Sequence, residues 1–101
     1  MANIKKEKPK KKTYRFYQQY NNVHIVGETY NGLKISFFET EAESLEEAYD
    51  KYKIKMMSLR QNNAKEIEDY FFRLYGGKML VESISERNID TETIDLTNNE
   101  H

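Results

Sequence analysis

An Asn31-Gly32 dipeptide between two strand-prone runs constrains the fold of this chain more than any other feature. Asn-Gly is a preferred sequence for a two-residue β-hairpin turn, because both residues adopt positive φ angles readily. The flanking runs Val23–Tyr30 and Leu33–Glu39 are rich in β-branched and aromatic residues, and so is the earlier run Thr13–Tyr20. Asn21-Asn22 can form a second tight turn. The pattern therefore predicts a three-stranded antiparallel meander from Thr13 to Glu39.

Two-residue turns fix the strand register, and the register sorts the side chains of the meander onto two faces. In this register Arg15 lies opposite Glu28, and Val26 lies between Tyr17 and Phe37. The face with contiguous aliphatic residues is expected to be the core; it holds Tyr17, Val26, Tyr30, Leu33, Ile35 and Phe37. The opposite face is expected to be the outer one; it holds Tyr14, Phe16, Tyr20, Val23, Ile25 and Phe38.

Two helices and a further strand are predicted after the meander. Capping boxes at Thr40-x-x-Glu43 and Ser44-x-x-Glu47 precede an apolar stripe from Leu45 to Leu59. A second stripe, capped by Asn63, ends at Gly76-Gly77, a common helix stop. Lys78–Ile84 then reads as a strand. The predicted fold class is α+β, with a three- to four-stranded antiparallel sheet in the order β-β-β-α-α-β and two helices on one face.

Charge divides the chain into three parts. Residues 1–12 contain six Lys and one Glu with little apolar content, which predicts a disordered basic arm. Residues 13–85 are expected to form a single α+β domain. Residues 86–101 contain one Arg and five acidic residues, which predicts an acidic flexible tail.

Composition excludes several kinds of chemistry. The chain of 101 residues has no cysteine and two histidines, so we expect no thiolate chemistry, no metal site and no cofactor. Phosphate-loop, dinucleotide and nucleophile-elbow motifs are absent, and we expect the chain not to be an enzyme. One weaker reading is a small catalytic site in which His24 faces Glu39 across the meander.

The expected location is the cytoplasm. No apolar run approaches the ~20 residues that span a bilayer, and no apolar segment follows the basic N-terminus, so we expect no membrane association. The frequent Lys, Asn, Ile and Tyr are typical of AT-rich genomes and suggest a phage or mobile element as the origin.

The expected outer face is the main candidate for binding, because it leaves aromatic residues without a core. Tyr and Phe are enriched at protein interfaces. We therefore expect a regulatory or inhibitory binding protein that occludes a protein partner; a second copy of the chain or cover from within the fold are the other readings. The candidate contact residues are Tyr14, Phe16, Tyr20, Ile25 and Phe38.

The alternative reading is a nucleic-acid-binding module. Its basic arm would neutralise phosphates, with further basic residues on the sheet. The candidate residues are Lys5, Lys6, Lys8, Lys10, Lys11, Lys12, Arg15 and Lys34.

Two segments resemble known recognition elements. The apolar, acid-flanked run Thr93–Thr97 resembles a SUMO-interacting motif, which implies that Ile94 and Leu96 anchor a strand added to a partner's sheet. The meander followed by a helix, with its strand-to-helix stretch Phe38–Ala48, resembles in outline the arm-binding domains of phage-type integrases. That resemblance implies insertion of the sheet into the DNA major groove.

Overall fold

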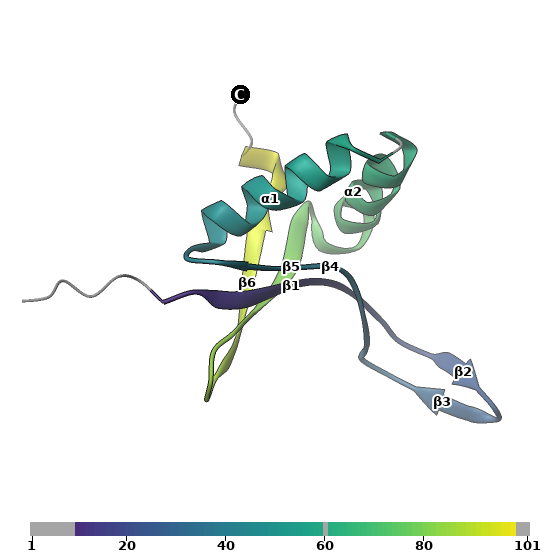
Figure 1. Ribbon diagram of the computed structural model, residues 1–101. Helices are drawn as coiled ribbons and strands as arrows, with labels where there is room; N and C mark the ends of the chain where they lie inside the picture. The colour runs from purple at the N-terminus through teal and green to yellow at the C-terminus, as the bar shows by residue number, and fades with distance from the viewer. Residues whose placement is uncertain (1–9, 60, 99–101) are drawn as a thin grey trace, which may run out of the picture.

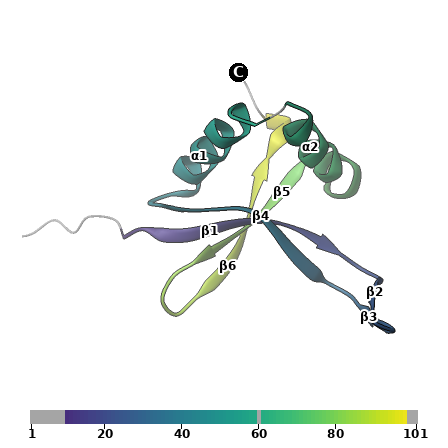
Figure 2. The ribbon, with the colours of Figure 1, turned by 45° about the vertical axis from the view of Figure 1, so that its right-hand side comes forward.

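The computed structural model describes residues 10–59 and 61–98, which form an α+β fold. A four-stranded antiparallel sheet has the order β4-β1-β5-β6, and β2 and β3 form a separate two-stranded sheet. Both helices lie on one face of the larger sheet (Figures 1 and 2), as predicted. The elements are β1 (Lys12–Tyr20), β2 (Val23–Ile25), β3 (Glu28–Tyr30), β4 (Leu33–Ala42), α1 (Leu45–Met57), α2 (Gln61–Tyr75), β5 (Lys78–Ile84), β6 (Ile89–Asp95) and the 3-10 helix η1 (Leu96–Asn98).

The predicted meander is wrong, because β1 pairs directly with β4 and not with the segment between them. β1 and β4 pair along their whole length, from Lys12 opposite Ala42 to Tyr20 opposite Leu33. β2 and β3 continue in the same register, with Val23 opposite Tyr30. The four strands therefore form one long antiparallel ribbon with its reversal at Val26-Gly27. Asn31-Gly32 lies within the ribbon and not at its end.

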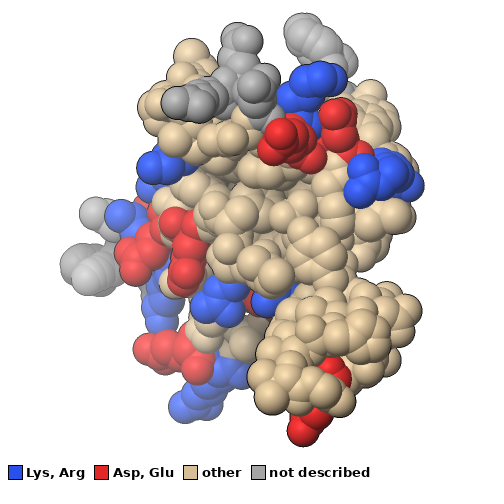
Figure 3. All heavy atoms as spheres, turned by 90° about the vertical axis from the view of Figure 1, so that its right-hand side faces the viewer, with Lys and Arg blue, Asp and Glu red and all other residues tan. Residues whose placement is uncertain are grey.

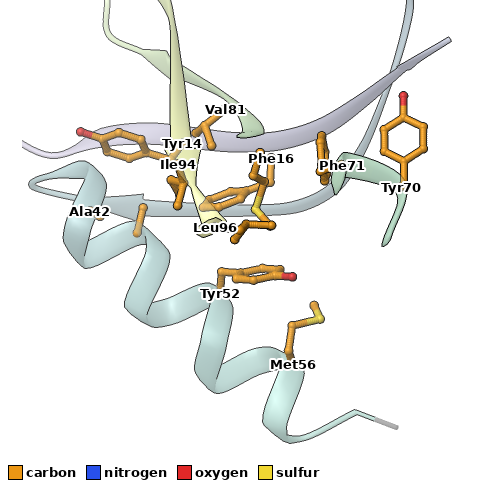
Figure 4. Close-up of a cluster of buried hydrophobic side chains, with 12 residues drawn as sticks. Tyr14, Phe16, Ala42, Tyr52, Met56, Tyr70, Phe71, Val81, Ile94 and Leu96 are labelled. Atoms are coloured by element: carbon orange, nitrogen blue, oxygen red, sulfur yellow. The ribbon is translucent and has the colours of Figure 1, made fainter. Parts of the chain in front are cut away.

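A β-bulge in the ribbon sets which aromatic residues reach the core. The register shifts between Phe16 and Tyr17, so Phe37 is an extra residue on β4. Phe37 and Phe38 consequently both pack against the core cluster, at 6.3 and 5.4 Å from the Phe16 ring centroid. Phe16 is fully buried and stacks on Tyr52 of α1 at 5.3 Å (Figure 4).

The ribbon leaves the four-stranded sheet after Phe16. β5 pairs with β1 only from Thr13 to Phe16, so the next residues of β1 have no strand on that side. α2 supports them instead: the Tyr70 hydroxyl donates a hydrogen bond to the Gln19 carbonyl oxygen at 2.6 Å, and the Tyr70 ring lies 5.5 Å from Tyr20. Beyond Tyr20 the ribbon projects away from the helices (Figure 2).

The ends of the helices follow the predicted signals in part. Ser44 caps α1 by accepting a hydrogen bond from the Glu47 amide at 3.1 Å, and the Glu47 carboxylate accepts one from the Glu43 amide at 2.7 Å. Thr40 lies in β4 and caps nothing, and α2 begins at Gln61, before the predicted cap at Asn63. The predicted stop at Gly76-Gly77 is confirmed.

Gly77 cannot be replaced without rearrangement at this stop. Its φ angle is +86°, and an added Cβ would lie 2.7 Å from the Thr97 side chain and 2.8 Å from the Phe72 ring. The Gly77 carbonyl also accepts a hydrogen bond from the Leu96 amide at 2.7 Å. The end of α2 is therefore joined to the start of η1.

The expectation of a flexible acidic tail is wrong for residues 89–98. β6 pairs with β5 along its length, from Ile89 opposite Ile84 to Asp95 opposite Lys78. Ile94 and Leu96 are buried in the core cluster. The domain thus extends past residue 85, and the segment resembling a SUMO-interacting motif is already paired, with both anchors buried.

Two buried tyrosines should respond oppositely to loss of the hydroxyl group. The Tyr52 hydroxyl has no hydrogen-bond partner among the described residues, whereas Tyr70 donates to Gln19. We expect Tyr52→Phe to raise the free energy of unfolding by about 1 kcal/mol and Tyr70→Phe to lower it by a similar amount. Urea unfolding of both variants measures this, and destabilisation by Tyr52→Phe would contradict the unpaired hydroxyl.

Candidate protein-binding hairpin

The β2–β3 hairpin is joined to the rest of the ribbon by a reciprocal pair of asparagine contacts. The Asn31 side-chain oxygen accepts a hydrogen bond from the Asn22 amide, and the Asn21 side-chain oxygen accepts one from the Gly32 amide, both at 2.8 Å. Asn22 and Gly32 have φ angles of +59° and +74°, which few other residues adopt without strain. These contacts replace ladder pairing and hold the hairpin to β1 and β4.

The backbone conformation at the tip of the hairpin is unfavourable in free energy. Val26 and Gly27 have φ angles of +47° and +79°, the signs required by a type I′ turn. Asn, Asp or Gly is usual at the first position, and a β-branched residue there is a genuine outlier. The Val26 side chain is also 95% exposed, so no packing within the chain offsets this cost.

The hairpin exposes apolar side chains beside one carboxylate. Val23, Ile25, Glu28 and Tyr30 share one face through the pairing of β2 with β3, and the Tyr30 hydroxyl donates a hydrogen bond to the Glu28 carboxylate at 3.1 Å. The other face holds His24 and Thr29, whose side chains hydrogen-bond to each other at 3.0 Å. Ile25 and Tyr30 are 45% and 41% exposed, and Ile35, nearer the ribbon base, is 49% exposed. Exposed apolar side chains are thus present on both the hairpin and the adjoining part of β4.

The hairpin has little charge. Between Gln18 and Leu33 the only Asp, Glu, Lys or Arg residue is Glu28, in a chain of which 33% is made of these four residue types. Figure 3 looks onto this end of the molecule and shows a mostly tan lobe with some red at its lower part, while blue and red groups are spread over the remainder. Such a surface matches the composition of protein interfaces and offers no cations to phosphates.

Most of the predicted protein-contact residues lie in the core. Tyr14 and Phe16 are buried, and Tyr20 and Phe38 pack against the core cluster beneath the helices. The face that holds Phe16 and Phe38, which pair across β1 and β4, is the one that the helices cover, whereas Tyr17 and Phe37, expected in the core, are buried or packed against it as well. Ile25 alone of the predicted set is exposed. Val26, Tyr30 and Ile35, expected in the core, are exposed instead.

The two basic residues predicted for nucleic acid on the sheet are engaged by a buried carboxylate. Glu82 is 6% exposed and accepts a hydrogen bond from the Lys34 ammonium at 2.6 Å. The Arg15 guanidinium lies 3.6 Å from Glu82 and from Glu39. The hydrogen bond to Glu82 raises the pKa of Lys34, which also lies over the Tyr17 ring at 5.0 Å. Arg15 and Lys34 therefore neutralise the buried Glu82 carboxylate.

The described end of the basic arm lies beside a distant turn, at the other end of the ribbon. Lys10, Lys11 and Lys12 line a hollow of about 360 Å³ together with Ser85, Glu86 and Arg87 from the turn between β5 and β6. The remaining lysines of the predicted set, Lys5, Lys6 and Lys8, lie outside the described residues. Arg87 also lines this hollow. The sequence alone did not indicate this, because Arg87 is remote from the arm in the chain.

Two other predicted arrangements are not formed. His24 lies on β2 opposite Thr29, and Glu39 lies on β4 opposite Arg15, so the proposed His24–Glu39 pair is wrong. The resemblance to integrase arm-binding domains depended on the three-stranded meander, which does not form.

Searches for known sites and relatives return no assignment. In residues 10–59 and 61–98, no group of three or more His, Cys, Asp or Glu side chains is placed to hold a metal ion. None of the described helices combines the length and apolar character needed to cross a bilayer. A scan against protein-family models finds no match, and searches of curated proteins and of solved structures find none either.

Replacing Val26 should stabilise the fold. Asn adopts the positive φ angle of a type I′ turn more readily, so we expect Val26→Asn to raise the free energy of unfolding by about 1 kcal/mol. Val23→Asn, the matched change at a paired strand position, should bring no gain. Urea unfolding compares the two, and a lower stability for Val26→Asn than for wild type would contradict strain at the tip.

Proposed function

We propose that this chain is a binding protein that attaches to a protein partner through the β2–β3 hairpin and acts by occluding the partner's surface. The observation that carries the proposal is Val26, a β-branched residue kept at positive φ and 95% exposed at the hairpin tip. Backbone strain of this kind persists where the rest of the structure determines it, and it clusters at functional sites.

The form of the hairpin supports a protein as the partner. β2 and β3 pair only with each other among the described strands, so each has a free edge that could accept a further strand. An isolated two-stranded hairpin is marginally stable in water, and exposed apolar edges favour aggregation. Contact of Ile25, Val26 and Tyr30 with a partner would cover this surface.

Capture experiments with matched variants test the proposal. Wild-type protein, immobilised and exposed to nuclease-treated lysate of the source organism, should retain a partner protein in a molar amount roughly equal to that of the immobilised chain. Ile25→Ser/Val26→Asn should reduce retention at least about tenfold, because anchors at an interface centre dominate affinity. Ile54→Ser alters a residue that is 67% exposed on α1 and should leave retention unchanged.

One result of the same capture experiment would contradict the proposal. Equal retention by the hairpin variant and wild type would exclude the hairpin as the contact. Sedimentation of the purified chain tests whether the partner is a second copy of the chain. A concentration-dependent dimer that the hairpin variant abolishes would show that it is.

A second candidate function is binding to nucleic acid at the opposite end of the ribbon. The supporting observation is the hollow in which three lysines of the arm meet Arg87, with one carboxylate, Glu86, beside them. Segments distant in the sequence thus contribute four cations to one surface.

A salt series measures this second candidate. If the four cations of the hollow contact duplex DNA, log affinity should fall with log salt at a slope of about −3.6 from these contacts. The quadruple Gln variant at Lys10, Lys11, Lys12 and Arg87 should flatten the slope by about that amount. A control with the same charge change replaces Lys55, Lys65, Arg73 and Lys78. Equal slopes for the two variants would reject the hollow as the phosphate contact.

A further inference from the structure

The last strand of the four-stranded sheet, β6, has one side paired with β5 and the other side open (Figure 1). Two hydrogen bonds fix which of its backbone groups face β5. The Ser85 amide donates to the Asn88 carbonyl at 2.9 Å, and the Leu96 amide donates to the Gly77 carbonyl at 2.7 Å. Because hydrogen-bonded and non-hydrogen-bonded pairs alternate along an antiparallel ladder, every second residue between these two bonds turns its backbone groups away from β5.

The outward amide and carbonyl groups in the body of β6 belong to Ile89, Thr91 and Thr93. All three residues are β-branched and exposed. Natural edge strands are commonly blunted by Pro, Lys or a bulge, whereas β6 contains neither Pro nor Lys and pairs with β5 without a register shift. This edge is therefore regular and can accept a further strand.

The opposite edge of the sheet, formed by β4, is obstructed. By the same alternation Ile84 turns its backbone groups toward Thr13, so Thr13 turns away from β4 and its partner Glu41 points outward. The outward Glu41 carbonyl already accepts a hydrogen bond from the Lys51 ammonium at 2.8 Å. The bulge at Phe37 further disturbs this edge. An added strand consequently meets fewer obstacles at β6 than at β4.

Acidic side chains flank the β6 edge on the side of the sheet that the helices cover. Glu92 lies opposite the buried Val81, and Asp90 shares its face because it is two residues away. Asp95 lies 4.0 Å from the Lys78 ammonium, whereas no described cation is within ion-pairing distance of Asp90 or Glu92. The outward, β-branched residues lie on the opposite, open face. The edge thus has negative charge on one side and uncharged side chains on the other.

We propose that the outer edge of β6 accepts an extended segment of a partner protein in which basic residues alternate with apolar ones. The backbone of this segment pairs with the outward groups of Thr91 and Thr93. Its Lys or Arg side chains lie beside Asp90 and Glu92, and its apolar side chains cover the open face. The basic residues are confined to the middle of the segment, because Arg87 and the lysines of the hollow lie at the turn before β6. This surface is separate from the hairpin and from the function proposed for it.

Titration of the isotope-labelled full chain with the blocked peptide TVKVKVT, followed by amide NMR, tests the proposal. The lysines of this peptide share one face of a strand and its valines share the other. The expected result is saturable shifts and slowed hydrogen exchange at Thr91 and Thr93, with the peptide TVEVEVT binding at least about tenfold more weakly. Absence of saturable shifts, shifts centred on Ile25 and Tyr30 of the hairpin, or equal binding of the two peptides would overturn the proposal.

A proline variant tests the backbone contact. Thr93→Pro removes an amide that points outward and keeps the pairing of β6 with β5, since Pro is tolerated where an edge strand faces solvent. This variant should lose saturable binding of TVKVKVT, whereas Thr93→Val, which keeps the amide, should bind the peptide as wild type does. Retained binding by Thr93→Pro would contradict strand addition at this edge.

A charge variant tests the choice of partner and leaves the backbone intact whether or not the proline variant folds. Asp90→Asn/Glu92→Gln should weaken binding of TVKVKVT about fivefold, because two exposed ion pairs are lost. Glu66→Gln/Asp69→Asn makes the same charge change on α2 and should leave binding unchanged. Equal affinity of wild type and the β6 variant would overturn the assignment of a basic segment.

Hydrogen exchange of the protein without peptide shows whether the edge is already occupied. The Thr91 and Thr93 amides should exchange rapidly, because they point to solvent. Strong protection before peptide is added would overturn the proposal. Protection that rises with protein concentration would assign the edge to a second copy of the chain, and protection independent of concentration would assign it to another part of the same chain.

Discussion

The antiparallel pairing of β1 with β4, and the bulge at Phe37 within it, is the constraint on which the other parts of the structure depend. Strand residues normally alternate between the two faces of a sheet, so consecutive aromatic residues would point to opposite sides. The bulge lets both Phe37 and Phe38 pack with Phe16, and Phe37 also lies 6.2 Å from the rings of both Tyr52 and Phe71. Helices α1 and α2 are thereby joined to one strand pair. Because β5 leaves β1 after Phe16, the same ribbon also projects beyond the sheet and forms the hairpin.

Local signals in the sequence predicted the elements whose formation depends on local interactions. The Ser44 cap, the stripe that buries Ala48, Tyr52 and Met56, and the Gly76-Gly77 stop each act within a few residues, and they are found as predicted. The hairpin reversal was mistaken because Asn31-Gly32 is the better turn sequence in isolation. The chain reverses at Val26-Gly27, which allows the full length of β1 and β4 to pair and places Arg15 beside Glu39. Tertiary pairing here outweighs turn preference, and turn preference is all that a short window of sequence can reveal.

The candidate site was harder to predict, because it depends on which face of the ribbon the helices cover. Tyr14 and Ile25 share a face in the register predicted from a turn at Asn21-Asn22, yet the ribbon continues through these residues and projects away from the helices beyond Tyr20. Tyr14 lies beneath the helices and is buried, whereas Ile25 is exposed. The buried carboxylate of Glu82 was equally hidden: it engages Arg15 and Lys34 from β5, remote in the chain from both. Only the low charge between Gln18 and Leu33 was visible in the sequence as a mark of the projecting surface.

The tip of the hairpin carries a free-energy cost that the core does not require. Val26 has a backbone conformation unfavourable to its side chain. This conformation is not needed for the fold, since Asn would suit the turn better. In a sequence otherwise consistent with its structure, such local conflicts concentrate where a partner or ligand acts. The hairpin projects after the ribbon has left the sheet, so this cost lies beyond the aromatic packing around Phe16. That separation lets the domain tolerate the cost, because the interactions that stabilise the core do not depend on the hairpin tip.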